Sequence, residues 1–246
     1  MALIRIADRF PRGSVRLARL LTAVRPSLRR YPAQTRYGTI ICDVSETACY
    51  GLAVRGEISH WRADEDAISR IPLNEQSVVL DIGANIGVMT RIFAARAGHV
   101  HAFEPAARAL ALLRENAPSN CTVHPIAIGD HEGIAHFAEL EALDESHLAE
   151  NGVEVPMRTV DSLELECDLI KIDVEGYEPD VLRGATETLK RGPMLMFEAL
   201  TAVALDQCVS IVLVANPNYR FQDMGSGQNF FASVDAHAVP EVMPVI

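Results

Sequence analysis

Short apolar runs alternate with amphipathic segments along most of the chain. The run at 78–80 is apolar throughout, which is typical of a strand buried on both faces of a sheet. Further mainly apolar runs that predict strands occupy residues 100–103, 122–128, 169–172 and 194–197. The segments between them place apolar residues at helical spacing, and we expect helices after Gly87, after Pro105, from Glu178 to near Gly192 and over 202–212. This alternation predicts a mainly parallel sheet with right-handed crossovers.

Other patterns flank or interrupt this alternation. Residues 39–42 and 51–54 predict a small antiparallel hairpin before the core, and residues 219–221 and 230–232 predict an antiparallel edge pair after it. Residues 134–137 predict a short extra strand. Residues 138–154 are acidic and poorly periodic, so we expect a surface loop of the kind that often acts as a lid. Asp161 and Glu164 have capping-box spacing, which predicts a short helix before 169–172.

Length and composition favour one catalytic domain with an N-terminal extension. The chain has 246 residues, 49% of them hydrophobic, which is enough to bury a full core. We divide it into an extension, 1–36, and a catalytic domain, 37–246. Within that domain, we expect 37–72 to form the hairpin and a cover over the active site and 73–246 to form the core.

Charge is unevenly distributed between these parts. Residues 1–36 contain nine arginines and one acid, a net charge of +8, whereas the rest of the chain carries −19. The acidic body disfavours DNA as a partner. Leu17, Leu20, Leu21 and Val24 recur at helical spacing among the arginines, which predicts a helix that covers the catalytic domain. Contact with an anionic membrane surface, or disorder, stays open as an alternative for this arm.

The sequence shows no pattern for a membrane span, a secretory signal or a disulfide framework. The longest apolar stretch in the arm, 20–24, is far below the ~20 residues that a membrane helix needs. Five cysteines form no C-x-x-C pair, and we expect reduced thiols in the cytoplasm. Eight histidines form no H-x-x-x-H or comparable cluster. Oligomeric state leaves no signal.

The strongest candidate site follows the run at 78–80. Asp81 ends that run, Gly83 and Gly87 turn the chain into a helix, and Glu104 ends the next run. Glycines let a backbone turn sharply close to a ligand, and an acid about 20 residues further on accepts hydrogen bonds from a ribose diol. Glu104 lies 21 residues after Gly83. This spacing predicts a nucleotide-type cofactor site.

The loop chemistry favours a cationic cofactor over a pyrophosphate. Dinucleotide loops usually have glycine where this chain has Asn85. Asp81 beside the loop would repel a diphosphate but suits a ligand that carries an ammonium and a sulfonium. S-adenosylmethionine therefore fits better than NAD.

Three segments, taken in order, resemble the FkbM family of S-adenosylmethionine-dependent methyltransferases. They are Asp-Ile-Gly-Ala-Asn-Ile-Gly at 81–87, Phe-Glu-Pro at 103–105, and Asp-Leu-Ile-Lys-Ile-Asp-Val-Glu-Gly-Tyr-Glu at 168–178. The last is the most specific, and the likeness extends from about Tyr37 to Phe231. The resemblance implies a Rossmann-like class I α/β fold, whose mainly parallel seven-stranded sheet has an antiparallel C-terminal edge strand. It also implies O-methylation of a hydroxyl on a sugar, glycan or secondary-metabolite scaffold, with S-adenosylhomocysteine as product.

Roles at the site follow from position on the sheet. Asp81, Glu104, Asp173 and Glu198 each follow or end an apolar run and should share the carboxyl edge, where such sheets bind ligands. Cofactor-binding residues are then expected at the loop, the ribose acid and the end of the third run. They are Asp81, Gly83, Asn85, Gly87, Glu104, Asp173 and, around the adenine, Ala127, Ile128 and Asp130.

Proton removal from the acceptor needs a base near the methyl group. Lys171, Asp173 and Glu175 share one face of an extended strand, so Lys171 can tune the acids or form a buried ion pair that orders the strand. We expect Asp173 near the methionine and the acceptor, Glu175 as base or acceptor ligand, and Glu178 in support. Asp173, Glu175 and Glu198 offer oxygen ligands for Mg²⁺, but carboxylates are common on this edge and a divalent metal is not expected.

Two other functions stay open at this point. An RNA or protein methyltransferase could dock its substrate with the basic arm, and a catalytically silent scaffold could bind the cofactor without turnover. The acceptor itself is not encoded in any motif.

Overall fold

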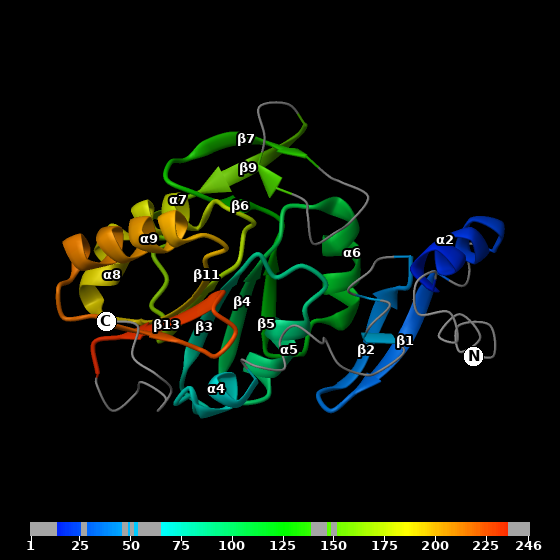
Figure 1. Ribbon diagram of the computed structural model, residues 1–246, viewed down its shortest axis with the longest axis horizontal. Helices are drawn as coiled ribbons and strands as arrows, with labels where there is room; N and C mark the ends of the chain where they lie inside the picture. The colour runs from blue at the N-terminus through cyan, green and yellow to red at the C-terminus, as the bar shows by residue number, and fades with distance from the viewer. Residues whose placement is uncertain are drawn as a thin grey trace.

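The structure is a computed structural model that describes residues 14–25, 29–45, 49, 52–53, 65–138, 147–148 and 152–235. Figure 1 shows a large central sheet with helices on both faces, a smaller sheet along the top of the view, and an N-terminal helix and hairpin at one end. This is the mixed α/β architecture that the strand and helix pattern predicts.

The large sheet has seven strands in the order β12-β13-β11-β10-β3-β4-β5. Its strands are β3 (Val78–Ile82), β4 (His99–Phe103), β5 (Cys121–His124), β10 (Leu169–Ile172), β11 (Met194–Glu198), β12 (Arg220–Asp223) and β13 (Asn229–Ser233). The five from β5 to β11 are parallel, and β13 runs antiparallel to both of its neighbours. The predicted mainly parallel sheet with an antiparallel C-terminal strand is therefore confirmed. The C-terminal strand β13, however, is not the edge strand, because β12 lies outside it.

The helices that follow the core strands lie where the apolar periodicity predicts them, with one difference. They are α5 (Val88–Ala94), α6 (Ala107–Asn116), α7 (Glu178–Arg183), α8 (Thr186–Arg191) and α9 (Ala202–Ala215). A further short helix not predicted from the sequence, α4 (Glu65–Arg70), precedes β3. The predicted helix from Glu178 to near Gly192 is broken into α7 and α8. A Cβ at Gly184 would lie 2.0 Å from the carbonyl oxygen of Gly129, so the backbone passes too close to another loop for a side chain.

Asp161, predicted to begin a capping box, caps a different helix from the one expected. Residues Asp161–Leu163 form the 3-10 turn η4, which confirms the short helix before β10. The carboxylate of Asp161, however, accepts hydrogen bonds from the backbone N–H groups of Glu187 (2.9 Å) and Thr188 (2.8 Å) in the first turn of α8. Asp161 thus caps α8 rather than its own turn.

The predicted third strand, 122–128, belongs to two sheets. Its first part is β5, and its last two residues are β6 (Ala127–Ile128), which pairs with β9 (Val153–Arg158). β7 (Gly133–Ala138) and β8 (His147–Leu148) complete a four-stranded sheet in the order β6-β9-β7-β8. The expectation of a loop over 138–154 is therefore wrong for β8 and for the start of β9. Residues 139–146 and 149–151 lie outside the described part of the chain.

The N-terminal hairpin uses other strands than predicted. β2 (Gly38–Asp43) matches the expected first strand, but it pairs with β1 (Arg30–Thr35), and residues 52–53 are helical. The prediction failed because β1, Arg-Tyr-Pro-Ala-Gln-Thr, lacks an alternating apolar pattern and contains a proline. The division at 36/37 falls in the turn of this hairpin, so the hairpin spans both predicted parts.

The basic arm contacts the body of the protein. Helix α2 (Ser14–Val24) precedes the hairpin, and the Arg19 side chain donates to the carbonyl oxygen of Ser45 at 3.0 Å. Arg29 and Arg30 form ion pairs with Asp43 and Glu115, respectively. These contacts join helix α2 to the end of the hairpin and the hairpin to α6, while a cover over the catalytic domain, a membrane contact or another partner for the arm stays a prediction. Within the described residues, no helix is long and apolar enough to cross a bilayer.

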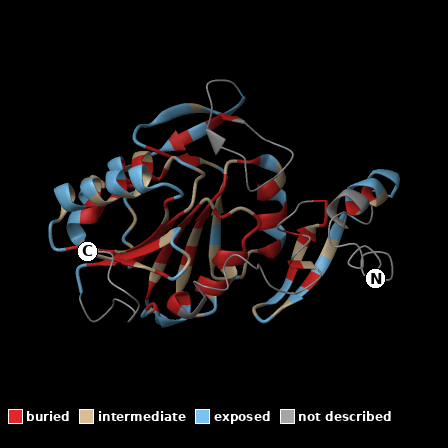
Figure 2. Cartoon of the chain, viewed as in Figure 1, coloured by how far each residue is buried: buried red, intermediate tan, exposed pale blue. Residues whose placement is uncertain are grey.

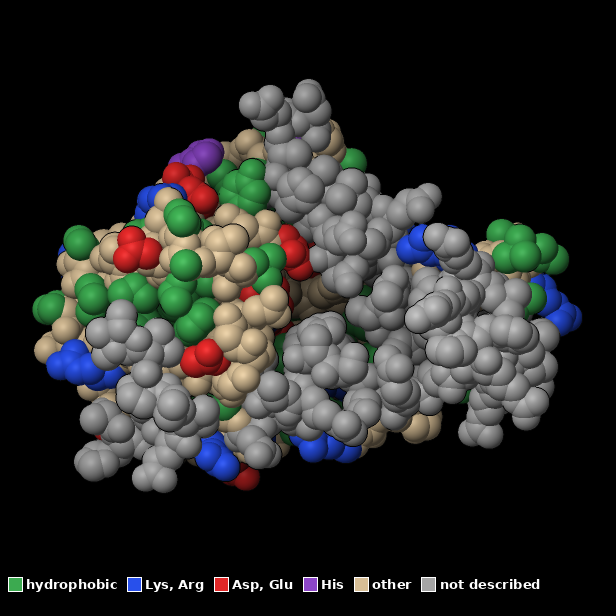
Figure 3. Space-filling view, viewed as in Figure 1, with side chains coloured by type: hydrophobic (Ala, Val, Ile, Leu, Met, Phe, Trp, Pro, Cys, Tyr) green, Lys and Arg blue, Asp and Glu red, His purple; other side chains and the backbone are tan. Residues whose placement is uncertain are grey.

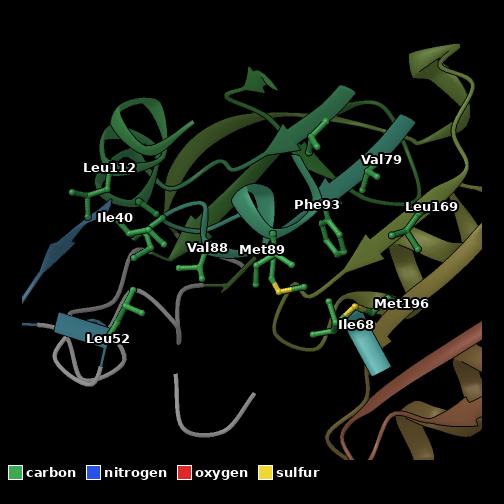
Figure 4. Packing of buried hydrophobic residues seen from close by; sticks show 14 of the residues in the cluster. Ile40, Leu52, Ile68, Val79, Val88, Met89, Phe93, Leu112, Leu169 and Met196 are labelled. Atoms are coloured by element: carbon green, nitrogen blue, oxygen red, sulfur yellow. The ribbon is translucent and has the colours of Figure 1, made fainter. Parts of the chain in front are cut away.

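Buried side chains form two main clusters on opposite faces of the large sheet. Figure 2 shows buried residues concentrated on the strands and on the inward sides of the helices. One cluster includes hairpin, α5 and α6 residues, and Figure 4 shows Ile40 close to Leu112 and Val88. Asn116 of α6 adds hydrogen bonds to the backbone of Ile41 and to the carbonyl oxygen of Ile86. The hairpin is therefore held against the loop that follows β3. No disulfide joins the five cysteines.

Candidate functional site

The loop after β3 is built from three residues in the left-handed region. Gly83, Asn85 and Gly87 have φ values of 75°, 49° and 89°. A Cβ at Gly83 would lie 1.8 Å from the carbonyl oxygen of Asp173, and one at Gly87 would lie 2.7 Å from the Leu113 side chain. The glycines are therefore required by contacts within the protein. The prediction that they let a ligand approach is not tested by these contacts.

Asp81 lies fully buried beneath this loop. One carboxylate oxygen, Oδ2, accepts a hydrogen bond from Thr90 Oγ1 of α5 at 2.5 Å. The other, Oδ1, lies 3.3 Å from Lys171 Nζ in an ion pair but accepts no hydrogen bond from the described residues. A buried anionic oxygen without a hydrogen bond is costly, and the Lys171 ammonium offsets part of this cost.

Lys171 joins the ends of β3 and β10. Its Nζ donates to the carbonyl oxygen of Gly83 at 2.8 Å and forms ion pairs with Asp81 and Asp173 at 3.3 and 3.4 Å. Burial alone would lower the pKa of Lys171, but the carboxylates of Asp173 and Asp81 outweigh it and raise that pKa above its ordinary value. Both alternatives from the sequence are thus present together, since the buried ion pair orders the strand and also places a cation beside Asp173.

Glu104 follows β4 and lies next to the loop. Its Oε2 accepts a hydrogen bond from the Asn85 backbone N–H and its Oε1 accepts one from that of Ala106, both at 2.8 Å. Burial raises the pKa of Glu104 to about 7, although both backbone donors act to lower it. A carboxylate has about four acceptor positions, so two hydrogen bonds leave room for a diol. The structure therefore brings Asp81, Glu104 and the loop together, as the sequence predicts.

The turn after β10 carries the second group of acids. Asp173 ends the strand with 29% of its side chain exposed, and Glu175 and Gly176 follow in the left-handed region. Glu178 Oε1 accepts hydrogen bonds from the N–H groups of Val174 (3.0 Å) and Gly176 (3.2 Å). Glu178 therefore supports the turn, as predicted, and burial raises its pKa.

Glu198, the last residue of β11, completes this group. One carboxylate oxygen from each of Asp173, Glu175 and Glu198 lies within 4.8 Å of the other two. Burial, followed by repulsion from Asp173 and Glu175, raises the pKa of Glu198 to about 8. Figure 3 shows acidic side chains beside a hollow near the middle of the displayed face. Such a group can take up a proton near neutral pH or offer oxygen ligands to a divalent cation.

The residues predicted around the adenine lie in β6 and the turn after it. Ala127 and Ile128 are both 4% exposed, and Ile128 packs in the cluster that contains Phe103 and Ile82. Asp130 is exposed and pairs with His131 at 2.6 Å. The apolar pair is thus placed near the ends of β3 and β4. The contact of Asp130 with an adenine amine stays a prediction.

Sequence reasoning missed the parts played by Thr90 and Glu198. Thr90 is polar at a helix position that periodicity assigns to the core, and its burial beside an acid was the available signal. Glu198 was singled out as an edge acid and a possible metal ligand, but no spacing rule could show that it meets Asp173 and Glu175. The arrangement can bind cationic and hydroxyl groups beside Asp81 and Glu104, and it can accept a proton at the group of acids around Glu198.

Comparisons with known proteins agree with this geometry. The family described as "Methyltransferase FkbM domain" matches residues 81–207, which hold Asp81, Glu104, Lys171 and the whole acidic group. The hexuronic acid methyltransferase AglP of Haloferax volcanii is 30% identical over 152 residues, covering 54% of this chain and 61% of that protein.

A solved structure shows the same fold. The methyltransferase FkbM from Methylobacillus flagellatus KT aligns with a TM-score of 0.51 and 19% identity, covering 66% of this chain and 44% of that one. The chain thus spans less than two-thirds of the length of either protein. The family match covers just over half of the chain; it begins inside β3, at Asp81, and includes the whole of β4, β10 and β11. The chain belongs to the FkbM methyltransferase family.

Proposed function

We propose that the protein is an S-adenosylmethionine-dependent O-methyltransferase that acts on a hydroxyl of a sugar or glycan. The observation that carries this proposal is the joining of two groups of residues by Lys171. One is the buried set of Asp81, Glu104 and the loop, and the other is the acidic group, in which the pKa of Glu198 is raised. Membership of the FkbM family supports methyl transfer, and the named substrate of the Haloferax volcanii relative supports a sugar-type acceptor.

The residues beneath the loop fit the methyl donor. When bound, S-adenosylmethionine supplies a methyl group activated by its sulfonium. The negative charge of Asp81 favours the donor's ammonium beside the loop, and Glu104 offers its remaining lone pairs to the ribose hydroxyls. Asn85, Gly83 and Gly87 shape the loop around the methionine part, and the apolar β6 residues fit beside the adenine.

The second group fits removal of the acceptor proton. Burial and the negative charges of Asp173 and Glu175 keep the pKa of Glu198 near 8, so its proton exchanges close to neutral pH, and its ionised form, which increases as the pH rises toward 8, is the one that takes the acceptor proton. Lys171 holds the Asp173 carboxylate at 3.4 Å and so fixes its position. Three acids this close together disfavour a carboxylate at the point of transfer, which supports a neutral hydroxyl as the acceptor.

Calorimetric titration tests the cofactor half of the proposal. Wild type should bind S-adenosylmethionine, and Glu104→Gln should weaken binding by about tenfold or more, because a charge-assisted hydrogen bond contributes ~1.5–3 kcal/mol. Glu132→Gln is the matched control, because this glutamate is exposed and pairs with Arg158 on the surface. Equal affinities in all three proteins, or no binding at all, would refute the proposed site.

Transfer assays with methyl-labelled donor test the acceptor half. Neutral and hexuronic-acid-containing oligosaccharides should be compared, and the labelled product should be treated with mild alkali. A methyl ether survives alkali whereas a methyl ester is cleaved, so a labile label would contradict transfer to a hydroxyl. Glu198→Gln should lower kcat by about 10²-fold or more while leaving donor affinity close to wild type.

A further inference from the structure

Asn116 lies between the N-terminal hairpin and the loop after β3. It is the last residue of α6 and is only 1% exposed. Figure 1 shows α6 between the hairpin and the large sheet. A buried amide needs hydrogen-bond partners within the protein, so its contacts show which parts of the molecule it joins.

The side-chain amide of Asn116 makes three hydrogen bonds to two backbone segments. Its Oδ1 accepts from the Ile41 N–H at 2.7 Å, and its Nδ2 donates to the carbonyl oxygens of Ile41 at 3.0 Å and Ile86 at 2.8 Å. Both N–H groups of the amide are therefore used, one on the hairpin and one on the loop. Exchanging the amide oxygen and nitrogen would break all three bonds, so the partners fix this orientation.

A proline in β1 leaves Ile41 free to bind this amide. Ile41 lies opposite Pro32 across the hairpin. Because proline has no N–H, it fits a position of an antiparallel pair at which no ladder hydrogen bond is made. Ile41 accordingly directs both its N–H and its C=O away from β1 and toward Asn116. An isolated two-stranded hairpin is marginally stable in water, so such contacts with α6 also hold it in place.

On the loop side, Ile86 lies between Asn85 and Gly87, two of the left-handed residues. The Asn85 N–H is held by Glu104, and Gly87 packs too closely against α6 for a side chain. Asn116 holds the carbonyl group between these two points. The three contacts together fix the path of the loop.

Arg91 of α5 makes a second connection between the same parts. Its Nε donates to the backbone carbonyl oxygen of Asn116 at 2.9 Å, and its Nη1 donates to that of Tyr37, in the hairpin turn, at 3.3 Å. Its own backbone N–H donates to the carbonyl oxygen of Gly87 at 3.1 Å. The hairpin, the end of α6 and the end of the loop thus belong to one hydrogen-bond network, so the hairpin cannot move without disturbing the loop.

We propose that Asn116 is a positioning residue for donor binding, through which the N-terminal hairpin fixes the conformation of the S-adenosylmethionine loop. This inference rests on the proposed function, which assigns the loop to the methyl donor. Asn116 acts through the loop and not by touching the donor, because a loop that is already ordered loses less entropy on binding. Coupling of this kind is reciprocal, so donor binding should also stabilise the contact between the hairpin and α6.

Calorimetric titration of the full chain with S-adenosylmethionine tests this role. Asn116→Ala keeps the Cβ beside Gly87 but removes the amide, and the dissociation constant should rise by about fivefold or more. Asn120→Ala is the matched control, because that amide also donates to backbone carbonyl oxygens, those of Ala94 and Ala97, but precedes β5 at the opposite end of the strands. The control should bind the donor as wild type does, although it also loses buried hydrogen bonds.

The outcomes of this titration separate the two proposals. No binding by wild type would refute the proposed function. Equal affinity in wild type and Asn116→Ala, or an equal loss of affinity in Asn120→Ala, would overturn the role of Asn116 alone.

Hydrogen exchange in the wild type gives a second measurement that needs no variant. The Ile41 N–H, which donates to Asn116, should exchange about fivefold or more slowly in the presence of saturating donor. The N–H groups of β12, at the far edge of the large sheet, provide the reference for general stabilisation by the ligand. If Ile41 gained no more protection than β12, the hairpin and the loop would not be coupled and the proposal would be wrong.

Discussion

The carboxylates on the β3–β4 side of the site and those on the β10–β11 side lie in different surroundings. On the β3–β4 side, Asp81 and Glu104 are buried and held by Thr90, Lys171 and backbone N–H groups. On the β10–β11 side, the acids are partly exposed, and the pKa of Glu198 is raised by its acidic neighbours as well as by burial. Acids fixed by donors are suited to hold a ligand in place, whereas acids that repel one another are suited to exchange a proton.

The difference teaches that position on a sheet edge does not by itself set the chemistry of an acid. All of these residues follow or end strands at the same edge. The acids differ in how many hydrogen-bond donors surround their carboxylates. The left-handed loop supplies such donors on the β3–β4 side, and few are present around the acids on the β10–β11 side. Lys171 is the element shared by both halves, and Gly83 is the point at which their backbones meet.

Gly83→Ala should have the largest effect. Its Cβ would lie 1.8 Å from the Asp173 carbonyl oxygen, a backbone atom that cannot move without displacing the end of β10. We expect a loss of about 4 kcal/mol or more in the free energy of unfolding, measured by urea denaturation.

Gly176→Ala is the matched control for this prediction. Gly176 also has a positive φ, 97°, but nothing lies within 4 Å of its Cβ position, so only the left-handed strain of about 1–2 kcal/mol is expected. Equal losses in the two variants would show that conformation, and not the contact between the halves, makes Gly83 necessary.

Lys171→Met should have the next largest effect, because it leaves the fully buried Asp81 without its cation. Removing one partner of a buried pair costs about 3–5 kcal/mol. Lys190→Met, at an exposed lysine paired with Glu187, should change stability by less than about 1 kcal/mol. If urea denaturation showed as small a loss for Lys171→Met as for Lys190→Met, the buried ion pair would not be a source of stability.

The sequence predicted best those parts of the fold in which burial requires apolar residues. β3, β10 and β11 are apolar runs buried on both faces, and a run of that kind has few other structures open to it. β1 was missed because the partner strand β2, and not its own pattern, makes it a strand. The break at Gly184 was missed for a similar reason, because the close approach of Gly129 is a tertiary contact.

In the candidate site, too, features set by local sequence could be predicted, and features set by contacts between distant segments could not. The spacing of Gly83 and Glu104 follows local rules for strand, turn and helix, and the structure places them together. The meeting of Glu198 with Asp173 depends on β11 pairing with β10, and the contact between the rings of His101 and His124 depends on β5 pairing with β4. Neighbours across parallel strands leave no mark in the spacing of a single chain, since a whole crossover separates them.

Thr90→Val should have an intermediate effect. Both Thr90 and Asp81 are fully buried, and valine removes the donor that Asp81 Oδ2 accepts from at 2.5 Å. An unsatisfied buried acceptor costs about 1–3 kcal/mol. Thr90→Ser retains the hydroxyl and loses one methyl, so it should keep most of the stability. If serine proved as destabilising as valine in denaturant unfolding, packing rather than the hydrogen bond would account for the role of Thr90.

The smallest expected effect is a dependence of thermal stability on pH. It distinguishes Glu198, on the β10–β11 side of the site, from Glu104, on the β3–β4 side. Glu198 has a folded pKa of about 8 against an ordinary value of 4.5, so the folded state binds more protons between these limits. Its contribution to stability is therefore present below pH 4.5 and is lost as the pH rises through 8. Glu104 adds a loss of the same sign that ends near pH 7. Wild-type Tm should thus fall from pH 5.5 to pH 8.5, and Glu198→Gln should reduce the fall above pH 7.

Salt then distinguishes the causes of the two shifts. Burial is the largest cause of the raised pKa at both glutamates, and at the partly exposed Glu198 repulsion from Asp173 and Glu175 adds to it near the solvent, whereas Glu104 is fully buried. High salt screens charges near solvent far more than buried groups. The fall in Tm above pH 7 should therefore shrink in 1 M NaCl, as it should in Asp173→Asn measured relative to its own low-pH value, while the fall below pH 7 should persist. Equal salt sensitivity in both ranges would mean that the two halves differ less than their geometry indicates.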